Sequence, residues 1–336
     1  MCGIKITSQN PLARNVVAIR SIAQKFLVPL FTKSGEKVVR QKTMRETADI
    51  LKQVRKIEIK TRGLSNDIFA GHYHSAFRGR GVAFSEVREY RVGDDVRDID
   101  WNVTARTRKP HIKIYEEERE LTMMLVVDVS GSGMFGSGDR DKRTVMTEIA
   151  AVLAFSAAQN NDKVGCLLFS DRVEKFIPPK KGRSHILMII RTLLEFEPES
   201  RGTSLVPPLE YLTAVLKKRS TTFVVSDFDM PADEDERLSK VLGLASRKHD
   251  MVAIKVYDRR DAELPDMGLV EMVDSESGQR VWVDTSSRSV REQYAREWQE
   301  RHEVADKILS RARVDHADVT TEEDYVKELI KLFKRR

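Results

Sequence analysis

Cysteine is scarce in this sequence. Cys2 and Cys166 are the two cysteines among 336 residues, which is too few for the disulfide framework of a small secreted domain. Cys166 lies in the apolar run VGCLLF and is most simply a small core residue. We therefore expect a reducing compartment, and the cytoplasm as the location of the protein.

Long hydrophobic runs are also missing. The most apolar part of the first segment, NVVAIRSIAQKFLVPLF, is interrupted by Arg20, Lys25 and Pro29, so it is too short and too charged to span a bilayer. It also lacks a signal-peptide cleavage pattern. We expect no integral membrane segment. An amphipathic surface anchor is one interpretation of this segment, and translation that begins at Met44 is the plainer one.

Most of the chain lacks an excess of charge of either sign. The net charge is +6, but residues 1–43 hold eight basic residues and one acid, which leaves −1 for residues 44–336. The high isoelectric point therefore belongs to the first segment, and the charge of the remaining chain gives no reason to expect nucleic acid as a partner. A nucleic-acid binder that relies on the basic first segment remains a third hypothesis for the function.

Strand and helix patterns alternate from Leu121 to the C-terminus. The apolar runs LTMMLVV, KVGCLLF, STTFVVSDFD and DMVAIKVYD predict strands that are buried on both faces. Segments with helical spacing separate them, and such βα units predict an α/β fold with a doubly wound, mostly parallel sheet. The stretch LVEMVDSESGQRVWVDT predicts a hairpin. A long helix over 289–313 is expected to turn Tyr294, Trp298 and Ile308 inward.

These patterns divide the chain into three parts. Residues 1–43 form a basic extension that we expect to be dispensable for folding. Residues 44–119 combine a predicted helix with a small β-rich module, in which glycines separate short alternating stretches. Residues 120–336 form the α/β domain.

Polar side chains end the first strand of this domain. In LVVDVSGSGMFGSG, Asp128 is followed by Ser130 and Ser132, which suits a dinucleotide loop, a nucleophile turn or a metal site. The glycines fit GxGxxG, but a polar loop separates them from the next helix, so no helix N-terminus would meet a pyrophosphate. Neither serine has the preceding glycine of a GxSxG nucleophile turn.

The metal interpretation predicts ligands elsewhere in the chain. Mg²⁺ prefers about six oxygen ligands, and ligands of open α/β sheets bind at the carboxyl ends of the strands. Asp227 ends the strand STTFVVSDFD, and Thr203 lies in the loop RGTSL. We therefore expect Mg²⁺ or Mn²⁺ at Asp128, Ser130, Ser132, Thr203 and Asp227. This D-x-S-x-S, T, D pattern resembles the metal-ion-dependent adhesion site of von Willebrand factor A domains. The plainer interpretation is a serine-glycine turn with Asp227 as a helix cap.

The stretch FSEVREYRVGDDVRDIDWNVTARTRKPHIKIYEEERELTMMLVVDVSGSG carries a more specific resemblance. It resembles a bacterial family known as domain of unknown function fifty-eight, over about residue 46 to the C-terminus. That resemblance implies a von Willebrand factor A-like, Rossmann-type fold behind a small N-terminal β-rich module. The family signature is present here as Gly93, Asp94, Asp95, Arg97, Ile99, Asp100, Trp101, Ala105 and Arg106.

The signature itself permits two interpretations. Its acids and the neighbouring arginines could form a carboxylate site or a partner contact. They could instead form an internal ion-pair network that holds the small module against the sheet, with Trp101 as an apolar anchor. We favour the ion-pair network, because acids matched by arginines usually pair.

The resemblance also implies partners. Members of the family are typically encoded beside MoxR-type AAA+ ATPases, which implies an adaptor role in assembling or maturing protein complexes. This chain has no Walker lysine pattern, so the ATPase would be a separate protein. We expect a non-enzymatic, metal-dependent interaction module whose metal ion attracts a carboxylate of a client protein. The alternative is a Mg²⁺-dependent hydrolase of a phosphate or acyl substrate, but no general base is evident near Asp128.

Overall fold

The structure is a computed structural model of the chain. The basic extension over 1–43 lies outside the described residues, as does most of the helix predicted from Met44, of which Arg55 and Lys56 are described as helical. The residues described are 55–56, 73, 76, 83–116, 121–137, 140–273 and 279–336.

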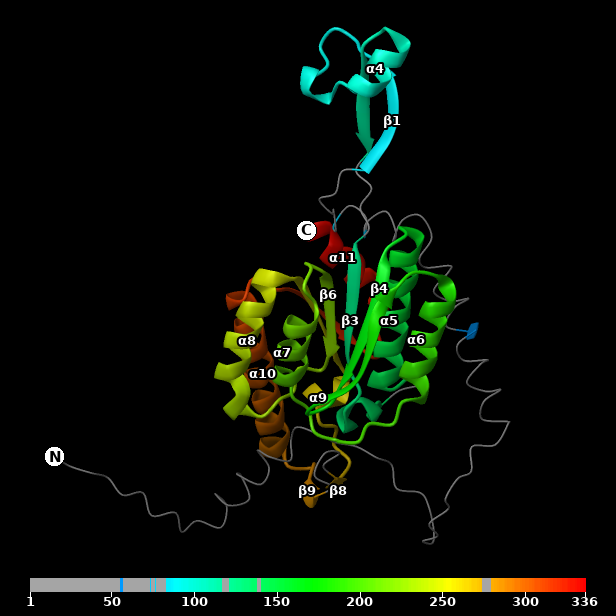
Figure 1. Ribbon diagram of the computed structural model, residues 1–336. Helices are drawn as coiled ribbons and strands as arrows, with labels where there is room; N and C mark the ends of the chain where they lie inside the picture. The colour runs from blue at the N-terminus through cyan, green and yellow to red at the C-terminus, as the bar shows by residue number, and fades with distance from the viewer. Residues whose placement is uncertain are drawn as a thin grey trace, which may run out of the picture.

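A six-stranded sheet forms the centre of the molecule (Figure 1). Its strand order is β10-β7-β6-β3-β4-β5, and all neighbouring pairs are parallel except β4 and β5. The predicted doubly wound, mostly parallel sheet is therefore confirmed. The strands are β3 (Thr122–Asp128), β4 (Lys163–Phe169), β5 (Val173–Lys180), β6 (Thr221–Ser226), β7 (Asp250–Tyr257) and β10 (Asp315–Thr320).

The four strands predicted from apolar runs are the four central strands of this sheet. The two edge strands, β5 and β10, were not predicted. β5 contains Pro178 and Pro179, and β10 has the polar sequence DHADVT. An edge strand is buried less completely and tolerates proline, so it lacks the continuous apolar pattern of a central strand.

Helices cover both faces of the sheet, as the alternating pattern predicts (Figure 1). Met123, Leu125 and Val127 of β3 pack on one face, and Met124 and Val126 pack on the other. The first face is covered by α5 (Lys142–Gln159), α6 (Arg183–Glu195) and α11 (Tyr325–Arg335). The second is covered by α7 (Val206–Val215), α8 (Asp235–Lys248) and α10 (Arg288–Arg311).

Helix α5 forms one side of the region where the central strands reach their carboxyl ends. Asp141 is its N-cap and accepts a hydrogen bond from the backbone N–H of Thr144 at 2.6 Å, which satisfies one of the free amides of the first turn. Ile149 and Leu153 are fully buried against the sheet, and each contributes about 1.5–3 kcal/mol relative to an exposed side chain. The first residue of this well-anchored helix is Lys142.

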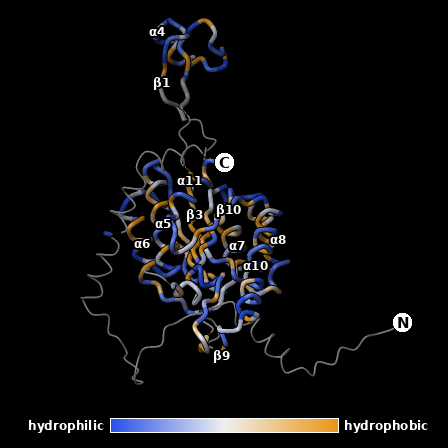
Figure 2. The backbone as a smooth tube through the Cα atoms, turned by 180° about the vertical axis from the view of Figure 1, so that it is seen from behind, coloured by the Kyte–Doolittle hydropathy of each residue, from blue (hydrophilic) through white to orange (hydrophobic). Residues whose placement is uncertain are grey.

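Hydropathy follows the layers of the fold. Figure 2 shows the hydrophobic residues gathered on the central strands and on the inner faces of the helices, with hydrophilic residues outside. Within the described residues, no helix is both long enough and apolar enough to cross a bilayer.

Two small antiparallel sheets stand apart from the large one. The strands β8 (Leu269–Val273) and β9 (Arg280–Asp284) form the predicted hairpin, whose turn lies outside the described residues. The strands β1 (Ala83–Glu89) and β2 (His111–Glu116) form the β-rich module, with the short helix α4 (Trp101–Thr107) between them. The remaining short elements are η1 (Val96–Asp98), η2 (Gly131–Met134), η3 (Ala232–Glu234) and α9 (Arg259–Ala262).

The signature acids organise the turns of the β-rich module. Arg88 donates two hydrogen bonds to the carboxylate of Asp94, at 2.8 and 2.7 Å, and Gly93 adopts a φ of +112°, which only glycine adopts easily. Asp95 is the N-cap of η1, and Asp100 is the N-cap of α4. These contacts lie within the module and shape it locally.

The expected anchoring role of Trp101 is wrong. Its side chain is 67% exposed, because it opens α4 immediately after the cap, and α4 has no buried residue. A hairpin with one two-turn helix is too small to enclose an indole ring. Arg97 and Arg106 are exposed as well, so all three side chains are accessible to solvent.

The chain contacts the α/β domain before it enters the module. Tyr73 is fully buried in the core, and its ring lies 6.2 Å from that of Phe333 in α11. Its hydroxyl donates to Oδ2 of Asp162 at 3.4 Å. The module therefore lies between two parts of the chain that both pack on the large domain.

Candidate metal centre

The carboxyl ends of β3 and β6 meet at one edge of the sheet. The parallel register pairs Val127 with Val225, so the next residues, Asp128 and Ser226, lie side by side. The hydroxyl of Ser226 donates to Oδ2 of Asp128 at 2.6 Å. The backbone N–H of Ser130 donates to Oδ1 at 2.8 Å. Asp128 is 2% exposed, so its carboxylate is held in one orientation.

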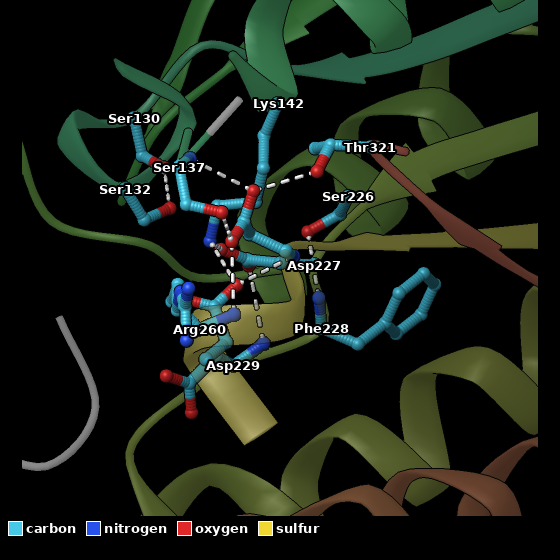
Figure 3. A network of polar contacts seen from close by, with 12 residues as sticks. Ser130, Ser132, Ser137, Lys142, Ser226, Asp227, Phe228, Asp229, Arg260 and Thr321 are labelled. Carbon is cyan, nitrogen blue, oxygen red and sulfur yellow. Dashed lines mark hydrogen bonds and ion pairs between the residues drawn. The ribbon is translucent and has the colours of Figure 1, made fainter. Parts of the chain in front are cut away.

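Two serine hydroxyls lie beside this carboxylate. The 3₁₀ turn η2 follows Ser130 and brings the Oγ atoms of Ser130 and Ser132 to 3.0 Å from one another. The hydroxyl of Ser132 also hydrogen-bonds to Asp227. Figure 3 shows these serines and Asp227 in one polar network. The serine-glycine turn of the plainer interpretation and the serine ligands of the metal interpretation are thus the same structure.

Thr203 lies in the loop between α6 and α7 and is buried. This loop is joined to η2, because the backbone N–H of Gly131 donates to the carbonyl of Arg201 at 3.0 Å. All five predicted ligands therefore lie at the same edge of the sheet. Asp227 is not a helix cap, since α8 begins at Asp235 after the turn η3.

A lysine that the sequence analysis missed completes the cluster. Nζ of Lys142 lies 3.0 Å from Oδ2 of Asp227 and 3.1 Å from Oδ2 of Asp261. The side chains of Lys142 and Asp227 are each 4% exposed. Asp261 belongs to α9, where its other contact is with the backbone N–H of Asp258 at 2.9 Å. Three separate elements thus meet around one ammonium group.

Burial and these neighbours set the ionisation of the centre. Burial, with the nearby charge of Asp227, raises the pKa of Asp128 to about 6. Burial also disfavours the charged form of Asp227, but the Lys142 ammonium outweighs it and lowers the pKa of Asp227. Burial alone would lower the pKa of Lys142, yet Asp227 and Asp261 raise it. Lys142 therefore remains charged and serves as a counter-ion.

Asp258 holds the loop that follows η2. Its carboxylate accepts from the backbone N–H of Ser137 at 3.0 Å and from the Ser137 hydroxyl at 2.6 Å. It also accepts from the hydroxyl of Thr321 at 2.6 Å and from the backbone N–H of Arg260 at 2.9 Å. A Cβ on Gly136 would lie 2.5 Å from the carbonyl oxygen of Arg140. This close approach requires glycine at position 136.

The donor atoms of the centre suit a hard divalent cation. They are carboxylate and hydroxyl oxygens, the ligands that Mg²⁺ and Mn²⁺ prefer. Among the described residues, the buried Asp128 carboxylate has no ion-pair partner, and a buried charge without a counter-ion costs several kcal/mol. A bound cation would relieve this cost. Lys142 already provides a counter-ion for Asp227.

A second acidic group lies farther along the same sheet. His302, Asp306 and Asp318 each place one ligand atom within 4.8 Å of the others. The ammonium of Lys255 lies among them, 3.0 Å from Nε2 of His302 and 2.9 Å from Oδ1 of Asp318, and contacts Asp306. The position that a metal would take is filled by Lys255, so this group is a poor candidate for a metal.

Residues 86–304 match the family model described as "Protein of unknown function DUF58". The chain belongs to the DUF58 family. The expected resemblance is confirmed, and it covers the signature module, the candidate centre and most of α10.

Mycobacterial relatives of this DUF58 protein carry no functional description in their names. Uncharacterized protein Rv1480 of Mycobacterium tuberculosis is 32% identical over 227 residues, which are 67% of this chain and 70% of the relative. Uncharacterized protein MAV169 of Mycobacterium avium is 30% identical over 104 residues, or 30% of this chain and 59% of the relative.

Solved structures similar to the DUF58 chain include two with nearly full coverage of the neighbour. BatB from Bacteroides thetaiotaomicron is 13% identical with a TM-score of 0.43, over 64% of this chain and 98% of BatB. The SpRpn10 VWA domain is 9% identical with a TM-score of 0.35, over 65% of this chain and 96% of that domain.

Proposed function

We propose that this DUF58 protein is a non-enzymatic, metal-dependent protein-interaction module. The observation that supports this best is the pair of buried serine hydroxyls, 3.0 Å apart, beside the carboxylate of Asp128. Such a cluster offers a cation several oxygens but little negative charge. Asp128, Ser130, Ser132, Thr203 and Asp227 would hold the ion, which is Mg²⁺ or Mn²⁺. The ion would supply an attachment point for a partner carboxylate.

Lys142 strengthens this proposal electrostatically. Its ammonium balances one of the two carboxylates, Asp227 and Asp261, that it contacts. A divalent cation beside Asp128 would then leave the edge of the sheet without excess negative charge. A carboxylate from a client protein would meet no strong repulsion there, and it would gain a charge-assisted contact in a partly dry site.

The partner that we propose is a MoxR-type AAA+ ATPase, with a client protein as the second contact. This part of the proposal rests on the family to which the chain belongs. A pulldown with the purified ATPase tests it. The pulldown is performed once with Mg²⁺ and once with EDTA, and the captured proteins are identified by mass spectrometry. Capture that is equal in both conditions would contradict a metal-dependent interaction.

Isothermal titration calorimetry is expected to detect one weak Mg²⁺ or Mn²⁺ site. Asp128→Ala should weaken binding by at least about 10- to 100-fold, the range seen when groups that orient metal ligands are lost. Asp171→Ala is the matched control, because Asp171 follows β4 at the same edge but is 41% exposed and pairs with Arg172. Equal heats for wild type and Asp128→Ala would contradict the site.

Two substitutions at Ser130 are expected to separate metal binding from partner binding. Ser130→Asp adds a negative ligand, so it should keep or tighten Mg²⁺ binding while lowering partner affinity by about tenfold, or 1.4 kcal/mol. Ser130→Ala should weaken both. The comparison needs calorimetry for the metal and surface plasmon resonance for a client protein that is captured with Mg²⁺. Full partner binding by Ser130→Asp would mean that the metal does not bridge to a partner carboxylate.

Hydrolysis is the alternative function. A pKa of about 6 would suit Asp128 as a general base. However, both of its oxygens already accept hydrogen bonds, from Ser130 and Ser226, and the residue is buried. Release of p-nitrophenol from its phosphate or acetate ester by the wild type with Mg²⁺, but not by Asp128→Ala, would favour the hydrolase.

A further inference from the structure

A cavity of about 570 Å³ adjoins the candidate metal centre. It lies between α10 and the carboxyl ends of β6 and β7, and it shares Lys142 and Asp227 with the centre. Its volume is within the range of about 300–1,000 Å³ that is usual for ligand pockets. The cavity is therefore large enough for more than one side chain of a partner.

Aromatic rings form one wall of this cavity. Trp298 and His302 are stacked, with ring centroids 4.7 Å apart, and Tyr257 lies 5.2 Å from Trp298. All three line the cavity. The expected inward position of Trp298 is thus only partly right, because the ring is half-buried and faces this space. The face of an indole attracts cations through its quadrupole.

The charged residues of the wall carry an excess of carboxylates. Six carboxylates and three cationic side chains line the cavity. Two of the cations are already paired within the wall: Lys142 with Asp227 and Asp261, and Arg301 with Asp235 at 2.9 Å. Lys255 pairs with acids outside the lining. Some carboxylates of the wall are therefore not balanced by a cation. They give the cavity a negative electrostatic potential, which complements a cationic ligand.

Glu297 is the acid best placed to receive this cation. Its Oε1 accepts from Gln293 at 2.9 Å, but its Oε2 is buried and has no hydrogen-bond partner among the described residues. Glu297 and Trp298 are neighbours on α10, and both line the cavity. A hydrogen-bond acceptor without a partner and an aromatic ring therefore line the same cavity.

The same wall also contains a hydrogen-bond donor without a partner among the described residues. The terminal nitrogens of Arg301 donate to Asp235 and to the carbonyl of Met230. Its Nε is buried without a partner among the described residues. A peptide can satisfy both atoms, because its basic side chain donates to Glu297 and its backbone carbonyl accepts from Arg301.

We propose that this cavity binds an arginine side chain presented by a partner protein. Guanidinium is planar, so it can stack on Trp298 while its in-plane N–H groups donate to Glu297, which an ammonium cannot match. The site goes beyond the proposed metal-dependent contact and does not require the metal. Together, the two sites would read an acidic and a basic residue of the same partner.

The test uses the full chain with Trp101→Phe and Trp282→Phe. The sequence has three tryptophans, and these two are 67% and 63% exposed, so Trp298 becomes the one indole and reports on the cavity. N-acetyl-arginine amide is titrated in EDTA, and N-acetyl-citrulline amide, which has the same shape without the charge, is the matched probe. We expect saturable quenching by the arginine probe and at least tenfold weaker binding of the citrulline probe.

Glu297→Gln in the same background is expected to weaken arginine binding at least tenfold. Glu303→Gln is its control, since Glu303 lies on α10 outside the cavity. Equal binding of both probes, no effect of Glu297→Gln, or no saturable quenching would each overturn the proposal. Asp128→Ala should leave arginine binding intact. Failure of the metal titration alongside normal arginine binding would therefore remove only the proposed function.

Discussion

Replacement of Lys142 by methionine is expected to lower the free energy of unfolding by about 3–5 kcal/mol. The ammonium contacts Asp227 and Asp261 at 3.0 and 3.1 Å, in a region where all three side chains are largely buried. Methionine keeps an unbranched stem but leaves two buried carboxylates without their counter-ion. Urea denaturation in EDTA measures the loss.

Two comparisons make this result specific. Lys240→Met removes an exposed lysine that pairs with Glu236 one helical turn away, so its effect should stay within about 0.5 kcal/mol. Asp227→Asn should recover part of the stability of Lys142→Met, because it removes one of the uncompensated charges. Mg²⁺ should stabilise Lys142→Met more than the wild type. A Lys142→Met protein as stable as the wild type would show that the ammonium is not the counter-ion of the centre.

Asp128→Asn is expected to stabilise the metal-free protein at pH 8 while removing its response to Mg²⁺. Burial and Asp227 raise the pKa of Asp128 from 3.8 to about 6 in the folded state. Folding therefore favours the protonated form. The contribution of protonated Asp128 to the free energy of unfolding is fully present below pH 3.8 and is lost as the pH rises through 6. The loss amounts to roughly 3 kcal/mol, since each pKa unit corresponds to about 1.4 kcal/mol.

Urea denaturation of both proteins between pH 4 and pH 8 measures this difference. In EDTA, the stability of Asp128→Asn relative to wild type should increase with pH. Adding Mg²⁺ should then stabilise the wild type and leave the variant unchanged, because only the wild type binds the ion. Asp171→Asn, at the exposed acid of the same edge, should show neither effect. A difference that does not depend on pH would mean that the buried Asp128 carboxylate is not destabilised.

The central part of the fold was predictable because strands that are buried on both faces are continuous apolar runs in the sequence. β3, β4, β6 and β7 are apolar runs with helical segments between them, and they occupy the centre of the sheet. β5 and β10 lie at its edges, where one side meets solvent and the pattern is broken. The helix α4 is short and has no buried residue, so hydrophobic spacing gave no signal for it.

The candidate centre was predictable only in part. Asp128 and Asp227 were found because both end a buried strand, and strand ends converge. The parallel register could also have found Ser226, since it places this serine opposite Asp128. Lys142 and Asp261 were missed because their contact joins α5 and α9, which are far apart in the sequence. No local pattern encodes such an ion pair.

The position of the β-rich module limits what one partner can reach. Residues 117–121 separate β2 from β3 in the sequence, and so short a connection spans at most about 18 Å. The module is thus attached at the amino end of β3. Asp128 and the serines lie at the carboxyl end of the same strand, about 23 Å away. In Figure 1 the two regions stand at opposite poles of the molecule. A compact partner can occupy one pole and leave the other open. Under the proposed function, a partner at the candidate centre would therefore leave the module uncovered.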